Sequence, residues 1–247
     1  MHNIFYFFRS NTSNHNFINF GIIHLSLLAF ALFISAYIYK MKSRSRKLEL
    51  FIGIVLLVQQ ITLYCWYTLS DFNILQEGLP LFHCRIAIIT ISIGMILNKK
   101  FPMKLGACWG IFTAPAALLF PGLDPFSFPH VTQFSYFIGH ILLLWGSVYI
   151  LFAKKINVSK KDIKNILIFT NFYHVLMFIL DTMIKANYGY MLTPPIKIGL
   201  TLNHMVYALV VISIFNIVLI LEYFILFNKE NNSFLRSYDE DDSLSIG

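Results

Sequence analysis

The run LNHMVYALVVISIFNIVLILEYFILF, residues 202–227, is long enough and apolar enough to cross a lipid bilayer as one helix. Such a helix needs about 20 consecutive, mostly apolar residues. Six further stretches of this kind precede it, at residues 17–39, 48–69, 80–97, 102–120, 132–153 and 163–184. Little of the chain is left for a soluble domain. We therefore expect an all-α membrane protein in which residues 1–228 form one polytopic bundle of seven transmembrane helices.

The composition supports this class, because 57% of the 247 residues are hydrophobic and only 13% are charged. The net charge is +7, and the basic residues concentrate in alternate loops; the loops between them hold Asp71, Glu77 and Asp124, with only Lys185 and Lys197 flanking the sixth. The basic residues that follow the first, third, fifth and seventh stretches are Lys40, Lys42, Arg44, Arg46, Lys47, Lys99, Lys100, Lys104, Lys154, Lys155, Lys160, Lys161, Lys164, Lys229 and Arg236. Since basic loops face the cytoplasm, we expect the amino terminus outside the cell membrane and the carboxyl terminus inside. We expect no nucleic-acid partner.

The carboxyl-terminal tail, the cysteines and the small residues of the fourth stretch give further expectations. Residues 229–247 are polar and include the acidic run 239–242, so we expect a disordered cytoplasmic tail. Nucleotide-binding and zincin signatures are missing from the sequence, and we expect no cofactor. Cys65 and Cys84 lie at the outer ends of neighbouring helices, which leaves a disulfide between them open, whereas Cys108 is expected to be a packing residue. Small residues at 106, 110 and 114 predict close helix contact.

Residues Leu79-Pro80-Leu81-Phe82-His83-Cys84-Arg85 place an imidazole, a thiol and a cation where the third membrane helix begins. A thiol with a nearby base is a candidate nucleophile, although a lone cysteine more often packs. Arg85 has two interpretations, a phosphate-binding residue or a cation that extends to the outer headgroups. His83 is expected to be an interfacial residue.

Polar residues recur at helical spacing on three later helices. Intramembrane polar groups of this kind face the bundle interior, because lipid cannot satisfy them. The members of these stripes are Gln133, Tyr136, His140, Ser147, Asn171, His174, Asp181, Asn203, His204 and Tyr207. At 1.5 Å per residue, Cys84 lies roughly 6 Å and His140 about 12 Å from the outer boundary. We therefore predict a reactive pocket in the outer half, with Asp181 hydrogen-bonded to His174 or Asn203.

Four motifs in this order carry a resemblance to a known family. They are Leu79-Pro80-Leu81 leading to Cys84, the loop 121–124, Tyr136-Phe137-Ile138-Gly139-His140, and Asn187-Tyr188-Gly189-Tyr190-Met191 followed by Pro194. In these motifs the chain resembles the YwaF-like bacterial integral membrane proteins, which belong with the transmembrane protein 164 family of acyltransferases. It departs from the family pattern in two places. Phe82 stands where members have histidine, and Asp181 stands where asparagine is expected.

The resemblance implies a seven-helix fold and transfer of fatty acyl groups between phospholipid and lysophospholipid. It implies that Cys84 is the nucleophile that carries the acyl thioester and that His140 is the general base. We expect the substrate to be bound by Arg85, Asp181, His204, Asn187 and Tyr188, and the phosphate role of Arg85 is inferred from the residue rather than from the resemblance.

Two other functions fit the same residues. The first is a transporter or small-molecule-binding protein, because polar stripes also line permeation paths. The second is a zinc-dependent lipid amidohydrolase, for which the histidines at 83, 140, 174 and 204 with Asp124 or Asp181 would supply ligands. The zinc reading is the weaker one, since the histidines do not pair four residues apart on any one helix.

Overall fold

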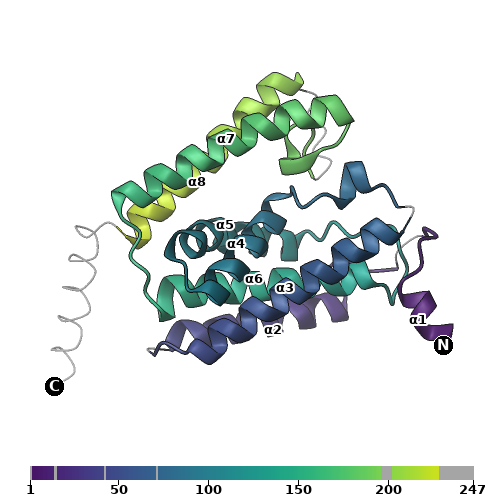
Figure 1. Ribbon diagram of the computed structural model, residues 1–247, viewed down its shortest axis with the longest axis horizontal. Coiled ribbons are helices and arrows are strands. Elements are labelled where there is room, and N and C mark those ends of the chain that lie inside the picture. The colour runs from purple at the N-terminus through teal and green to yellow at the C-terminus, as the bar shows by residue number, and fades with distance from the viewer. Residues whose placement is uncertain (1, 14–15, 42, 71, 196–201, 228–247) are drawn as a thin grey trace.

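Every regular element in the described part of the chain is a helix. The computed structural model in Figure 1 describes residues 2–13, 16–41, 43–70, 72–195 and 202–227. The predicted tail, residues 229–247, lies outside them. In chain order the elements are α1 (His2–Phe7), α2 (Ile22–Lys40), α3 (Arg46–Leu69), η1 (Ile74–Gly78), α4 (His83–Leu97), α5 (Lys100–Leu119), α6 (Val131–Val148), η2 (Tyr149–Ala153), α7 (Lys160–Ile184), η3 (Tyr188–Tyr190) and α8 (His204–Leu226).

The helices α2 to α8 each overlap one of the seven predicted stretches. Five of them are long and apolar enough to cross a membrane, namely α2, α3, α6 with η2, α7 and α8. Helix α4 has 15 residues, which span about 22 Å against about 30 Å of hydrocarbon. Helix α5 has 20 residues, includes Lys100 and Lys104 near its start, and is not among the five. The protein is therefore an all-helical, multi-pass membrane protein.

Helix α6 lies at the centre of the main group of helices and packs against α2, α3, α4 and α5. Helices α7 and α8 form an antiparallel pair along one side of this group (Figure 1). The predicted small-residue ridge on α5 is confirmed as a close helix contact. A Cβ atom at Gly106 would lie 2.6 Å from Thr90 Oγ1 and 2.8 Å from the Ala87 carbonyl oxygen on α4. Gly110 faces Leu143 and Ser147 of α6 in the same way.

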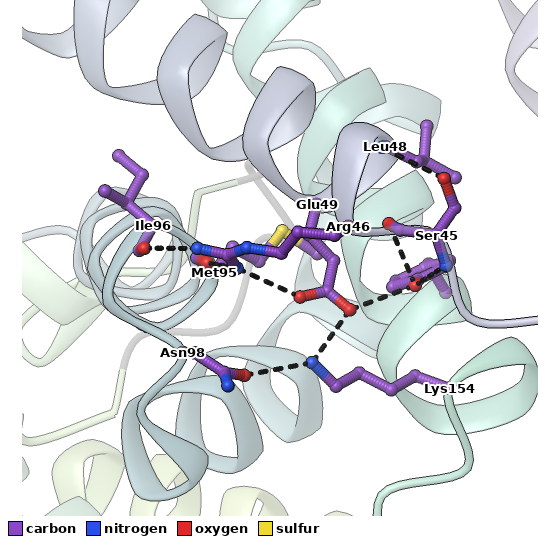
Figure 2. Close-up of polar contacts among 9 residues, drawn as sticks. Ser45, Arg46, Leu48, Glu49, Met95, Ile96, Asn98 and Lys154 are labelled. Carbon is purple, nitrogen blue, oxygen red and sulfur yellow. Dashed lines mark hydrogen bonds and ion pairs between the residues drawn. The ribbon is translucent and has the colours of Figure 1, made fainter.

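Buried charges join the helices at the end of the bundle that carries the basic loops (Figure 2). Glu49 on α3 is 3% exposed and accepts hydrogen bonds from Lys154 Nζ at 2.8 Å, Tyr149 Oη at 3.0 Å and Arg46 at 3.2 Å. The same Arg46 guanidinium donates to the last carbonyls of α4, those of Met95 and Ile96. Three of the basic residues at this end therefore have structural partners, since Lys104 also pairs with Asp162 at 2.6 Å.

A segment that the sequence did not predict covers the opposite end. Arg9 donates to the carbonyls of Tyr6, Ser127 and Pro129, and the Trp66 indole donates to the Phe8 carbonyl. His130 is fully buried, stacks on Phe126 with ring centroids 3.9 Å apart, and contacts the Arg9 carbonyl through Nε2 at 2.9 Å. A carbonyl only accepts, so His130 is the neutral Nε2–H tautomer. Its Nδ1 then accepts from the Thr132 amide at the start of α6.

This histidine predicts a pH dependence of stability. Burial lowers the pKa of His130 to about 4, against an unfolded value of about 6.5. As pH falls below 6.5, the unfolded chain binds a proton that the folded chain excludes, so stability is lost between pH 6.5 and about 4. Thermal unfolding of wild type and His130→Gln should show a stability difference that is largest near pH 7 and shrinks toward pH 5. An unchanged difference would contradict the prediction.

Candidate functional site

The first turn of α4 carries Cys84 and Arg85 in an electropositive position. Phe82 precedes the helix and its side chain caps none of the free N–H groups. Cys84 is the second helical residue, is half-buried, and lies against the backbone N–H of Arg85. A helix N-terminus and a neighbouring guanidinium both favour a thiolate, whereas burial of the sulfur favours the neutral thiol and is the larger effect. The sequence placed this thiol at a helix start, and the structure confirms that position.

The Arg85 guanidinium holds the loop that precedes α4. One terminal nitrogen donates to the carbonyls of Glu77 at 2.6 Å and Leu79 at 2.9 Å, and the other donates to Tyr67 Oη at 3.0 Å. Tyr67 donates in turn to Asp124 Oδ2 at 3.1 Å. Burial raises the pKa of both Glu77 and Asp124, and Arg85 opposes this shift. Three N–H donors of Arg85 are therefore committed to the loop and to Tyr67, and the guanidinium also interacts with the Tyr64 hydroxyl.

His140 on α6 has one engaged and one free ring nitrogen. Its Nδ1 contacts the Tyr136 carbonyl at 2.7 Å, so Nδ1 carries the hydrogen and Nε2 carries the lone pair. The Nε2 atom is buried and has no hydrogen-bond partner. Ile88, one turn along α4 from Cys84, faces Gly139 beside this histidine. In the described part of the chain no hydrogen bond joins Cys84 to His140.

Four tyrosines surround the thiol. Those at positions 64, 136, 173 and 190 lie within electrostatic range of Cys84. Two of them are fixed by hydrogen bonds, Tyr136 to the Ala117 carbonyl at 2.7 Å and Tyr173 to the Leu81 carbonyl at 2.6 Å. The sequence indicated Tyr136 and, within the fourth motif, Tyr190. Tyr64 and Tyr173 come from α3 and α7, and a single tyrosine on an apolar helix cannot be distinguished by sequence from a packing or interfacial aromatic residue.

The residues predicted to bind substrate around η3 are engaged within the protein. Asp181 Oδ1 accepts from the Tyr188 amide at 2.8 Å, so the predicted hydrogen bond from Asp181 to His174 or Asn203 is wrong. Tyr188 Oη accepts from the Leu79 amide at 3.0 Å, which ties η3 to the loop before α4. The Asn187 amide bonds within its own loop, to Leu192 and Thr193. These residues position η3 beside Cys84.

His83 is not interfacial, which corrects the prediction from sequence. It is 7% exposed, and its Nε2 lies 2.8 Å from His174 Nε2 on α7. Its ring stacks on Phe215 of α8, with centroids 4.4 Å apart. The α7–α8 pair covers the start of α4, and hydropathy along the chain cannot report such coverage.

The other predicted groups lie apart or unpaired. His204 is exposed at the start of α8, and its Nδ1 contacts the Leu192 carbonyl. Cys65 and Cys84 are free thiols, so the disulfide left open by the sequence is not formed. Among the described residues no three His, Cys, Asp or Glu side chains are placed to hold a metal ion. Of the residues in the predicted polar stripes, Asn171 exchanges hydrogen bonds with Asn216 of α8, and Ser147 donates to the Leu143 carbonyl of its own helix.

The four motifs noted in the sequence thus meet around the start of α4. Residues 79–85 supply the thiol and the cation, Asp124 reaches Arg85 through Tyr67, His140 lies on the adjacent α6, and Tyr188 holds the loop before α4. The family model of the TMEM164 family matches residues 10–227, which include all four motifs. No curated protein and no solved structure matches the chain. The match extends over most of the sequence, and the chain belongs to the TMEM164 family.

Proposed function

We propose that this protein is an integral membrane acyltransferase that moves fatty acyl groups between phospholipids and lysophospholipids through a thioester on Cys84. The observation that carries the proposal is the free, buried Nε2 of His140 on the helix packed against the one that bears the thiol. A neutral imidazole whose other nitrogen is fixed by a carbonyl is set up to accept a proton. The motif resemblance to acyltransferases supports the same chemistry.

The proposed reaction has two symmetrical halves. His140 Nε2 takes the thiol proton of Cys84, and the sulfur attacks the ester carbonyl of a phospholipid. The tetrahedral intermediate expels the lysolipid alkoxide, which takes the proton from His140, and the acyl group remains on sulfur. A second lysolipid hydroxyl then gives its proton to His140 and attacks the thioester; the carbon–sulfur bond breaks, and the Cys84 thiolate takes the proton back from His140. We assign the Arg85 guanidinium to the lipid phosphate, and Asp181, Asn187 and Tyr188 to positioning.

The proposal includes the membrane arrangement. All of α2 to α8 cross the cell membrane in one domain, residues 1–228, with the amino terminus outside and residues 229–247 in the cytoplasm. The distribution of basic residues supports this orientation. Cys84 then lies near the outer leaflet, where phospholipid headgroups are within reach of Arg85 and His204.

The test is acyl exchange in reconstituted vesicles of phosphatidylcholine with a deuterated acyl chain and unlabelled lysophosphatidylcholine. Wild type should move the label to the lysolipid, and Cys84→Ala should reduce transfer to the protein-free rate. The matched control is Cys65→Ala, because Cys65 is an exposed thiol on α3 and should leave transfer unchanged. Equal transfer by Cys84→Ala and wild type would refute the thioester mechanism.

A further inference from the structure

Two tyrosines one turn apart on α3 flank the Arg85 guanidinium. The Arg85 Cζ atom lies 5.9 Å from the ring centroid of Tyr64 and 5.1 Å from that of Tyr67. The Tyr67 hydroxyl both accepts from Arg85 and donates to Asp124. The Tyr64 hydroxyl is buried, and its oxygen interacts with the Arg85 guanidinium, which can only donate. The hydroxyl proton has no acceptor among the described residues and is therefore available to a group that reaches this site.

A buried hydroxyl whose proton has no acceptor calls for an explanation, because nearly all buried polar groups are hydrogen-bonded. Tyr64 lies within electrostatic range of the Cys84 thiol and of Arg85. The first turn of α4, with its uncapped N–H groups, lies at the same place. A donor without a partner, a helix N-terminus and a cation together form the surroundings that stabilise a developing negative charge on oxygen.

We propose that Tyr64 is a catalytic residue whose hydroxyl donates a hydrogen bond to the oxyanion formed when Cys84 attacks an acyl ester. The inference rests on the proposed acyl transfer. When the sulfur–carbon bond forms, the carbonyl π electrons move to oxygen, and the oxyanion accepts from Tyr64 Oη and from the backbone N–H groups at the start of α4. When the carbonyl re-forms, the ester carbon–oxygen bond breaks and the alkoxide leaves. Tyr64 keeps its proton throughout, because it donates a hydrogen bond and transfers no proton.

The experiment measures acylation of purified protein by p-nitrophenyl decanoate, which releases coloured p-nitrophenolate as the thioester forms. Tyr64→Phe should lower the second-order acylation rate constant about 100-fold, the usual effect of removing one oxyanion donor. The melting temperature should change little, because the hydroxyl proton has no acceptor and the Arg85 bonds to Glu77, Leu79 and Tyr67 are kept. A lower melting temperature together with the slower reaction would make the hydroxyl structural and would overturn the proposal.

Two controls separate the possible failures. Tyr149→Phe removes a buried hydroxyl that bonds to Glu49 and Ser45 far from the site, and should lower the melting temperature without changing the rate. Cys84→Ala should abolish the acylation. A wild-type rate in Tyr64→Phe, with acylation still dependent on Cys84, would overturn the role of Tyr64 alone. Acylation that persists in Cys84→Ala would overturn the proposed function and this inference together.

Discussion

Replacing His140 with glutamine is expected to lower the rate of acyl transfer by about 10²–10⁴-fold, the usual contribution of a general base. Glutamine keeps a side chain of similar length that can bond to the Tyr136 carbonyl, but it has no nitrogen that accepts a proton at neutral pH. The free Nε2 of His140 makes no bond in the resting structure, so its loss should affect the reaction more than the fold. The measurement is the deuterated acyl exchange, normalised to folded protein.

A buried histidine elsewhere provides the control for this variant. His24 on α2 is fully buried, and its two ring nitrogens contact the Phe20 amide and the Leu118 carbonyl. His24→Gln should therefore lower stability and leave the rate per folded molecule unchanged. A folded His140→Gln protein that transfers acyl groups at the wild-type rate would remove His140 from the mechanism.

Replacing Glu49 with alanine is expected to be the most destabilising single substitution considered, by roughly 3–5 kcal/mol, as for other broken buried ion pairs. Glu49 accepts hydrogen bonds from Lys154, Tyr149 and Arg46, and the Lys154 side chain is only 11% exposed. Alanine would leave the Lys154 charge buried without its partner. The measurement is the free energy of unfolding in detergent micelles.

The Lys104–Asp162 pair provides a comparison, because the Asp162 side chain is 22% exposed and Glu49 is 4% exposed. Asp162→Ala should cost less than Glu49→Ala, because Asp162 is the more exposed carboxylate and Glu49 accepts hydrogen bonds from three side chains on different parts of the bundle; the two lysines left behind, Lys104 and Lys154, are equally exposed at 11%. Equal and small losses of unfolding free energy, below about 1 kcal/mol for both variants, would show that Glu49 does not hold α3, α4 and η2 together.

Much of the fold follows from hydropathy, because each apolar stretch must become a helix to satisfy its backbone in lipid. The stretches miss where some helices begin. The first was predicted from residue 17, but Phe20 has a positive φ of 61° and α2 starts at Ile22. The third was predicted from residue 80, but α4 starts at His83, after Pro80. Local backbone geometry sets these starts, and the hydropathy of a window averages over it.

The site was predicted in part, for physical reasons that differ by residue. Cys84 and His140 were indicated by residue chemistry and depth. Asp181 was assigned the wrong partner, because its carboxylate bonds to a backbone amide and any residue can supply that group. His83 was expected at the interface, but His174 of α7 and Phe215 of α8 cover it. Tyr64 was not singled out, because its neighbour Arg85 belongs to another helix, α4. The roles of such residues depend on contacts between helices that are far apart in the chain. These contacts cannot be deduced from a single sequence.

Peptide mass spectrometry of the wild-type protein, quenched during turnover with phosphatidylcholine vesicles, tests the thioester on Cys84 most directly. We predict a fatty acyl group on the peptide that contains Cys84, removed by neutral hydroxylamine, with Cys65 and Cys108 unmodified. The adduct should accumulate when no lysolipid is present and disappear when lysophosphatidylcholine is added. An acyl group on another residue, or acyl exchange that proceeds with the Cys84 peptide unmodified throughout, would contradict the central claim.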